Sequence, residues 1–225
     1  MICDYRINDI EVHKYIMPII DSNMYILLIG DMALIIDPHK NEDARNMLER
    51  QNVKRVSIFL THEHFDHISG VNYYKDLFPC IVYGNEQCKE RAIDPSKNLS
   101  YYHMATFMDK PKEEYQIAKE LFDENYGCKV DESFDDEKRL LINDISIRLV
   151  STPGHSPGSI CILIEDLYMF TGDTIVDGKR IITKLPGGSR KDYAEITKPY
   201  LESLDLDIIV FPGHGKEKRL QEFDL

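Results

Sequence analysis

The sequence predicts an α/β (α+β) fold, because short apolar runs of strand length alternate with turns rich in Gly or Pro and with helical stretches. Residues 56–60 (Val-Ser-Ile-Phe-Leu) are β-branched and aromatic, as expected for a buried strand. Asn41 stands at the start of a helical stretch, 41–50, in the position of an N-cap. Each half of the chain runs through strands, then a loop with His or Asp, then a helix. We therefore expect two similar halves.

The expected elements of the opening half are strands at 10–20, 23–30 and 32–37, a helix at 41–50, a strand at 56–60, a helix ending near 77 and a strand at 80–83. Those of the closing half are strands at 139–142, 144–151, 159–165 and 167–171, a helix at 191–203, a strand at 207–211 and a short terminal helix.

Residues 85–138 interrupt this pattern, and we expect a single domain over 1–225 with a helical insert at about 85–138. The insert holds a charged helical run at 112–125, and the acidic stretch 131–138 predicts a solvated turn. Its aromatic and apolar residues at near-helical spacing fit two interpretations, packing of the insert onto the domain or shaping of a pocket. They are Tyr101, Tyr102, Met104 and Phe107.

The most informative motif is Thr-His-Glu-His-Phe-Asp-His at residues 61–67, directly after the strand predicted at 56–60. It places four metal-competent side chains, His62, His64, Asp66 and His67, within six positions. Imidazole and carboxylate ligands without cysteine suit zinc, iron or manganese. Glu63 is not expected to be a ligand.

Three later segments repeat the order of apolar strand, Gly- or Pro-rich turn and metal-competent side chain. His155 lies in Thr-Pro-Gly-His-Ser-Pro-Gly, Asp173 in Phe-Thr-Gly-Asp-Thr, and His214 in Phe-Pro-Gly-His-Gly. A strand that ends in such a loop supports a site rigidly. The remaining histidines, His13, His39 and His103, are expected to have no metal role, although His39 could line the rim of a pocket.

Together the four motifs resemble the metallo-β-lactamase fold superfamily, and within it the glyoxalase II-like hydrolases. The resemblance runs from about residue 15 to 215. It implies an αββα four-layer sandwich, in which two mixed β-sheets pack face to face between outer helices and a metal site lies at one edge. An insert such as 85–138 often covers the active site in this family.

The resemblance also implies roles for single residues. His62, His64 and His155 correspond to the ligands of a first metal, and Asp66, His67 and His214 to those of a second. Asp173 corresponds to the carboxylate that bridges both metals. Asp37, in Leu-Ile-Ile-Asp-Pro, corresponds to an acid behind the site that orients a ligand.

Two metals roughly 3.5–4 Å apart can share one hydroxide and polarise the oxygen under attack. Asp66 and Asp173 would then act in catalysis, by offsetting the charge of the ions and positioning the nucleophile. We expect two Zn²⁺ per chain, with iron or manganese as alternatives, and hydrolysis of a small thioester, lactone or related ester. The alternatives are a mononuclear iron persulfide dioxygenase, a phosphodiesterase of the same superfamily, or a member that binds metal for structure only.

Charge bears on the partner. The chain carries 27 Lys and Arg against 39 Asp and Glu, a net charge of −12, and this field repels nucleic acid. A small-molecule substrate is therefore expected, without nucleic acid or membrane partners. The segment 177–190 departs from the glyoxalase II pattern, so glutathione specificity is not expected. Its Lys179, Arg180 and Arg190 either attract a carboxylate or phosphate or are solvated surface charges.

The five cysteines, Cys3, Cys80, Cys88, Cys128 and Cys161, are widely spaced and form no CxxC motif. Reduced thiols and a cytoplasmic location are expected from this pattern. The first residues lack the basic and apolar segments of a secretory signal.

Overall fold

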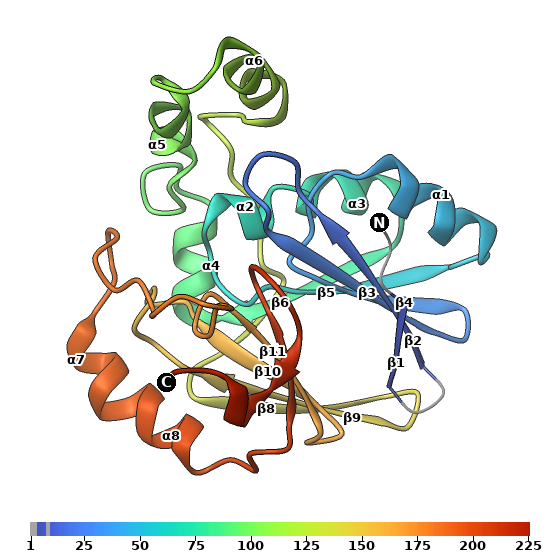
Figure 1. Cartoon of the computed structure of the whole chain (residues 1–225). Coiled ribbons are helices and arrows are strands. Elements are labelled where there is room, and N and C mark those ends of the chain that lie inside the picture. Colours follow the sequence, from blue (N-terminus) through green and yellow to red (C-terminus); the bar gives the residue numbers. More distant parts are fainter. Residues whose placement is uncertain (1–3, 8–9) are drawn as a thin grey trace.

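Two mixed β-sheets face each other in the computed structural model, which describes residues 4–7 and 10–225 (Figure 1). One sheet joins seven strands in chain order: β1 (Asp4–Ile7), β2 (Ile10–Ile16), β3 (Asn23–Ile29), β4 (Met32–Ile36), β5 (Arg55–Phe59), β6 (Cys80–Asn85) and β7 (Glu132–Phe134). The other joins six, in the order β13-β12-β11-β10-β9-β8. These are β8 (Glu137–Ile142), β9 (Ile145–Ser151), β10 (Ile160–Ile164), β11 (Tyr168–Gly172), β12 (Ile209–Pro212) and β13 (Lys218–Arg219).

Both sheets change from antiparallel to parallel pairing beside the strands that precede the predicted ligands. β4 pairs with β5 in parallel, and β11 pairs with β12 in parallel. Parallel strands bring their carboxyl ends to the same edge of a sheet. The loops after these four strands therefore open on one edge of the sandwich.

The space between the sheets is filled by apolar side chains of both. Tyr25 of β3 makes edge-to-face contacts with Phe170 and Phe211 of the second sheet, at centroid distances of 5.2 and 5.5 Å. Such pairs add specific geometry to apolar burial. Leu34, Phe59 and the residues around them continue this core.

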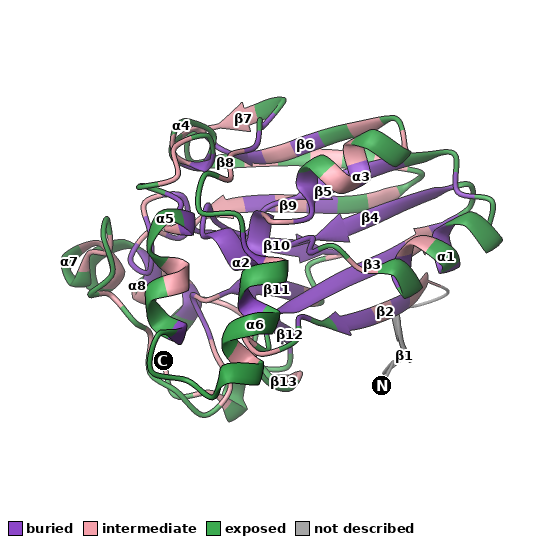
Figure 2. Ribbon diagram, turned by 90° about the horizontal axis from the view of Figure 1, so that it is seen from above, coloured by how far each residue is buried: buried purple, intermediate pink, exposed green. Residues whose placement is uncertain are grey.

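Helices cover the outer face of each sheet, which completes the four layers. The helices α1 (Glu42–Arg50), α3 (Val71–Leu77) and α4 (Glu86–Ala92) pack on the seven-stranded sheet through Leu48, Tyr74 and Ala92, among others. Figure 2 shows α1 and α3 lying across this sheet, whose strands are mostly buried. On the second sheet, α8 (Lys198–Glu202) and the short helix η3 (Leu220–Glu222) bury Leu201 and Leu220. The predicted αββα sandwich is confirmed.

Several predicted boundaries were wrong. The strand predicted at 10–20 ends at Ile16. The helix expected to end near 77 is two helices, α2 (Phe65–Ile68) and α3, because the Gly70 N–H donates to the carbonyl of Pro38 at 2.8 Å and not to the preceding turn. Gly70 also passes so close to His39 that a Cβ there would lie 2.6 Å from the His39 carbonyl carbon. The helix predicted at 191–203 is confirmed to within one residue at each end, and it consists of α7 (Arg190–Asp192), a π-helical turn (Tyr193–Thr197) and α8 in succession.

The acidic stretch 131–138 is not a solvated turn. It contains β7, which extends the seven-stranded sheet, and the start of β8. Asp131 explains this outcome, because its backbone N–H donates to the carbonyl of Val82 at 2.9 Å and its carboxylate accepts the Val82 N–H at 3.0 Å. The charge of these residues predicted a solvated turn, whereas their pairing with β6, which is distant in sequence, makes them a strand.

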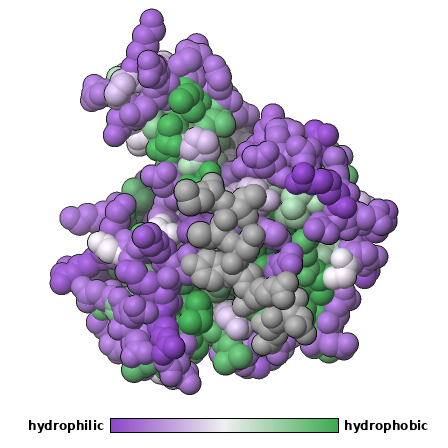
Figure 3. All heavy atoms as spheres, turned by 45° about the vertical axis from the view of Figure 1, so that its right-hand side comes forward, coloured by the Kyte–Doolittle hydropathy of each residue, from purple (hydrophilic) through white to green (hydrophobic). Residues whose placement is uncertain are grey.

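The rest of the 85–138 segment contains α4, α5 (Ser100–His103), a 3₁₀ turn (Met104–Phe107) and α6 (Lys112–Leu121). The last three project from one side of the sandwich (Figure 1). Figure 3 shows hydrophobic side chains gathered on this projecting part. Phe107 and Phe122 are buried against Phe65, which lies in the first metal motif, so the projection is anchored beside the predicted site.

Candidate metal centre

Loops from both sheets bring the predicted residues together at the edge where the parallel strands end. The seven-stranded sheet contributes Asp37 after β4 and residues 61–67 after β5. The six-stranded sheet contributes His155 between β9 and β10, Asp173 after β11 and His214 after β12. Six of these residues fall into two groups whose potential ligand atoms lie within 4.8 Å of one another. We call His62, His64 and His155 the first group, and Asp66, His67 and His214 the second group.

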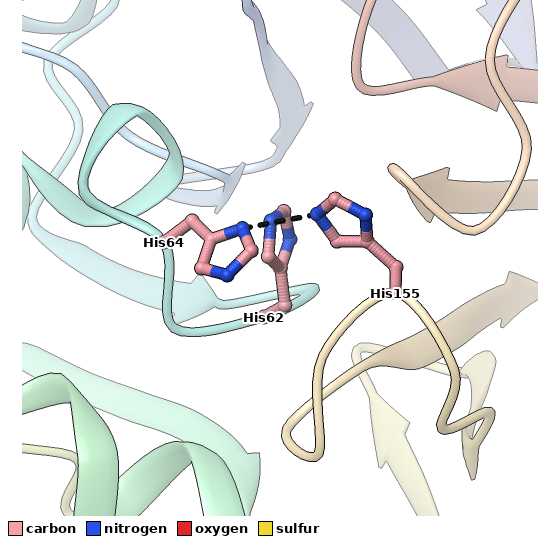
Figure 4. Close-up of side chains that lie close together, drawn as sticks. All are labelled: His62, His64 and His155. Carbon is pink, nitrogen blue, oxygen red and sulfur yellow. Dashed lines mark hydrogen bonds between the residues drawn. The ribbon is translucent and has the colours of Figure 1, made fainter. Parts of the chain in front are cut away.

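In the first group, three buried imidazoles converge on one point (Figure 4). His64 Nδ1 and His155 Nε2 lie 3.0 Å apart, and the ring centroids of His62 lie 4.6 and 4.9 Å from those of His64 and His155. His155 Nδ1 donates to the carbonyl oxygen of Ile182 at 2.8 Å. This bond fixes the tautomer that leaves Nε2 free to act as a ligand.

The second group combines two imidazoles with a carboxylate. Asp66 Oδ2 lies 3.3 Å from His67 Nε2 and 3.4 Å from His214 Nε2. Asp66 and His67 come from the start of α2, whereas His214 comes from the other sheet, so the second group also spans the two sheets.

Asp173 lies between the two groups. Its Oδ1 is 3.5 Å from His67 Nε2 and 3.5 Å from His214 Nε2, whereas its Oδ2 is 3.6 Å from His155 Nε2. One carboxylate oxygen therefore faces each group, so Asp173 could contact cations held by both.

Asp37 lies behind the second group. Its Oδ1 accepts the backbone N–H of Thr61 at 2.7 Å, and its Oδ2 accepts the Thr61 hydroxyl at 2.6 Å and His67 Nδ1–H at 2.9 Å. Asp37, His62 and His67 are also close enough to form a cluster. Both oxygens of Asp37 are therefore already hydrogen-bonded, and the contact with His67 fixes the orientation of that ring.

The donor set fits divalent metal ions. His62 Nε2, His67 Nε2 and Asp173 Oδ1 are buried and have no hydrogen-bond partner among the described residues. Burying such atoms without partners is unfavourable, and a bound cation would satisfy all three. Imidazole nitrogen and carboxylate oxygen are the ligands that zinc, iron and manganese accept.

The two groups differ in their protonation. Burial lowers the pKa of His62 and His64 well below the ordinary value, with neighbouring imidazoles adding to the effect. Burial also acts on His67, but three carboxylates, Asp66 foremost, outweigh it and raise its pKa well above the ordinary value. His62 and His64 are therefore neutral and ready to bind a cation, whereas a cation that binds His67 must displace a proton.

Two glycines make the close approach of these loops possible. A Cβ on Gly213 would lie 2.5 Å from Asp173 Oδ1 and 2.8 Å from His67 Cε1. Gly172 has a φ of +49°, and a Cβ there would overlap the Thr61 hydroxyl. The Gly before each of two predicted ligands, Asp173 and His214, is thus required by space.

A cavity of about 410 Å³ opens onto the two groups. One wall comes from the projecting part, with Leu99, Tyr102 and His103. The opposite wall comes from residues 176–186, which we call the pocket loop, and which contributes Val176, Lys179, Arg180, Ile182, Leu185 and Pro186. The sequence left open whether the aromatic residues of the insert shape a pocket or pack the insert onto the domain. Tyr102 lines the cavity, whereas Phe107 packs in the core of the projection.

Other sequence expectations need correction or extension. His39 does not line the rim: it is 1% exposed and buried behind the site, where burial lowers its pKa to about 4. Arg190 does not line the cavity that contains Lys179 and Arg180. Cys3 lies outside the described residues, and the other four cysteines are free thiols. Sequence reasoning missed Thr61 and Ile182 because their roles depend on contacts with distant segments.

Comparisons with known proteins agree with this geometry. The family model of the metallo-beta-lactamase superfamily matches residues 18–214. The probable metallo-hydrolase YqgX of Bacillus subtilis is 27% identical over 206 residues, covering 89% of this chain and 89% of the relative. The uncharacterized protein Rv2581c of Mycobacterium tuberculosis is 27% identical over 207 residues, covering 86% of this chain and 85% of the relative.

Among solved structures, the BLEG-1 B3 metallo-beta-lactamase is similar with a TM-score of 0.75 and 26% identity, covering 94% of this chain and 95% of that chain. The di-iron-bound form of TTHA1623 has the same fold, with a TM-score of 0.70, 22% identity and coverage of 92% and 94%. None of the helices in the described ranges combines the length and apolar character needed to cross a bilayer.

Proposed function

This chain belongs to the metallo-β-lactamase superfamily, and we propose that it is a dinuclear metal-dependent hydrolase of a small thioester, lactone or related ester. The observation that carries the proposal is the position of Asp173, whose two oxygens face different groups of ligands. A complete group of potential ligands lies on each side of it, which supports two metal ions. The name of YqgX, a probable metallo-hydrolase, supports the same class of reaction.

In this proposal His62, His64 and His155 hold one ion, Asp66, His67 and His214 hold the other, and Asp173 binds both. When bound, the ions supply Lewis acidity and lower the pKa of water to about 7. Asp66 and Asp173 offset the positive charge and orient the attacking water. Asp37 and the Ile182 carbonyl keep His67 and His155 in the ligand tautomers.

A covalent intermediate on cysteine is disfavoured. Burial raises the pKa of Cys128 and Cys161 to about 12 and that of Cys88 well above its ordinary value. Such thiols are poor nucleophiles. None of the described cysteines lines the cavity beside the metal groups.

The cavity walls support a substrate with an apolar portion. Ile20, Leu99, Ile182 and Leu185 surround the approach to the metal groups, and Lys179 adds a positive charge on the pocket loop. Apolar walls with a few convergent polar groups are usual for sites that bind small molecules. We propose that Lys179 attracts a carboxylate or phosphate on the substrate.

Metal content tests the proposal first. Protein purified without chelators or a His tag should contain two metal ions per chain, measured by inductively coupled plasma mass spectrometry. Asp173→Asn and His155→Ala should lose metal, whereas His13→Ala, which alters a histidine outside both groups, should retain it. One iron per chain in the wild type would contradict the dinuclear assignment and favour oxygen-dependent persulfide chemistry.

Hydrolysis is then tested with a panel of thioesters and lactones in isotopically labelled water. In a single turnover, solvent oxygen should enter the product directly. An acylated side chain trapped by mass spectrometry would refute the mechanism.

A further inference from the structure

Glu63 lies between two ligands of the first group, yet its carboxylate does not join either metal group. The side chain is fully buried, with 0% exposure. Its Oε1 accepts Arg91 Nε–H at 2.5 Å, and its Oε2 accepts the Ser156 hydroxyl at 2.8 Å. Glu63 is adjacent to His62 and His64 in sequence, and Ser156 directly follows His155. The hydrogen bond between Glu63 and Ser156 therefore joins the loop that holds His62 and His64 to the loop that holds His155.

Arg91, near the end of α4, extends the connection to both walls of the cavity. Its Nη2 donates to the carbonyl oxygen of Pro186 at 3.1 Å and approaches that of Lys97 at 3.4 Å. Pro186 belongs to the pocket loop, which also supplies the Ile182 carbonyl to His155. Lys97 lies two residues before Leu99 in the opposite wall. One guanidinium therefore contacts the metal motif, the pocket loop and the segment that leads into the opposite wall.

Two glycines leave room for this pair. A Cβ on Gly158 would overlap the Glu63 carboxylate, and a Cβ on Gly187 would lie 2.6 Å from Arg91 Nη2. A buried carboxylate is strongly unfavourable unless it is paired and hydrogen-bonded. Arg91 and Ser156 satisfy both conditions here, because a planar guanidinium can donate to several acceptors in fixed directions.

We propose that Glu63 and Arg91 are positioning residues, which hold His64 and His155 at the spacing that the first metal needs and fix the distance between the two cavity walls. The proposal rests on the proposed function only in taking the first group to be a metal site. One ion pair, between the buried Glu63 and the partly buried Arg91, would thus control both the affinity of the first metal and the width of the substrate pocket.

The second group has a separate support, which provides a matched comparison. Asn23 Nδ2 donates to the carbonyl oxygens of Pro212 at 2.9 Å and Gly215 at 3.1 Å, on either side of His214. Loss of the Arg91 contacts should thus weaken metal binding at the first group only. Loss of the Asn23 contacts should weaken metal binding at the second group only.

The test is a Co²⁺ titration of metal-free protein, followed by absorption and by chelator competition. Each group is isolated in a background that lacks the other, His214→Ala for the first group and His155→Ala for the second. Arg91→Met should weaken Co²⁺ binding to the first group about 10–100-fold and leave the second group unchanged. Asn23→Ala should do the reverse.

Arg148→Met is the control, because Arg148 is also paired with a carboxylate, Asp166, and its side chain is 17% exposed against 16% for Arg91. It should leave both groups unchanged. If Arg91→Met fails to fold, the double variant Glu63→Gln with Arg91→Met leaves no unpaired buried charge and serves in its place. Unchanged affinity of the first group, or equal weakening of both groups, would overturn the proposal.

A second readout concerns the pocket. Arg91→Lys keeps a positive charge beside Glu63 but cannot hold both walls. It should therefore bind Co²⁺ at the first group more tightly than Arg91→Met does. Its KM should still exceed that of the wild type, and by more for bulky than for small p-nitrophenyl esters. Equal KM changes for all esters would contradict the role in pocket width. If the wild type hydrolyses no ester, the proposed function fails, whereas the Co²⁺ titration still decides the role of the pair.

Discussion

Replacing Asp37 by Asn changes the contacts of one side-chain oxygen behind the metal centre, Oδ2, while preserving the shape of the side chain. Asp37 has a φ of 53°, a left-handed conformation that Asn tolerates well, so the backbone should not be strained. The amide oxygen can still accept the Thr61 N–H in place of Oδ1. The amide nitrogen must then occupy the position of Oδ2, which accepts His67 Nδ1–H at 2.9 Å in the wild type.

Two donors would face each other at that position, so His67 should move its proton from Nδ1 to Nε2. Nε2 is the atom that faces Asp66 and Asp173, at 3.3 and 3.5 Å, and a protonated Nε2 cannot bind a metal. Loss of such a supporting contact costs about 10–100-fold in metal affinity, which corresponds to about 1.4–2.7 kcal/mol.

The assay is zinc titration of the metal-free variant against a chromophoric chelator at neutral pH. The second metal should bind more weakly by that factor, and the first should bind as in the wild type. Asp131→Asn is the control, since Asp131 also accepts a backbone N–H but lies between Lys75 and β6, outside both metal groups. Wild-type affinity of Asp37→Asn for both metals would refute the assigned role.

Three further predictions concern the same site. Gly213→Ala should abolish metal binding at the second group, because the added Cβ would lie 2.8 Å from His67 Cε1. Gly30→Ala, where no atom lies within 4 Å of the added Cβ, should only lower the melting temperature, and equal metal content in the two variants would contradict this. On acidification the second group should release its metal first, because the raised pKa of His67 makes protons compete there; simultaneous loss of both metals on dialysis would refute it. Phe122→Ala should destabilise the fold by about 3–5 kcal/mol. Tyr102→Ala, at a position 50% exposed, should change KM and keep the free energy of unfolding within about 0.5 kcal/mol of the wild type. Equal losses of stability in thermal unfolding would contradict separate roles for the two residues.

The edge where the site residues meet could be predicted because each follows a strand of recognisable composition. His62, Asp173 and His214 come shortly after β5, β11 and β12. Gly172 beside Asp173, and Gly213 and Gly215 beside His214, mark the turns there. Parallel pairing of these strands then brings their ends together. The local pattern was sufficient here because strand ends and turns are determined mainly by nearby residues.

Contacts between distant segments could not be predicted in this way. The pairing of Glu63 with Arg91, for example, depends on the direction of α4 relative to the metal motif. The strand β7 was missed because its acidic residues suit solvent, and only its pairing with β6 makes it part of the sheet. His39 follows Asp37 in sequence, yet the approach of Gly70 encloses it.

Each metal group takes two ligands from the seven-stranded sheet and one from the six-stranded sheet. An ion bound to either group would therefore join the sheets and resist their separation, much as a crosslink does. A ligand present at about 1,000 times its Kd adds about 4.1 kcal/mol to the free energy of unfolding. Metal supply would then set not only the activity of the enzyme but also its lifetime, since a metal-starved chain would open more readily to proteases.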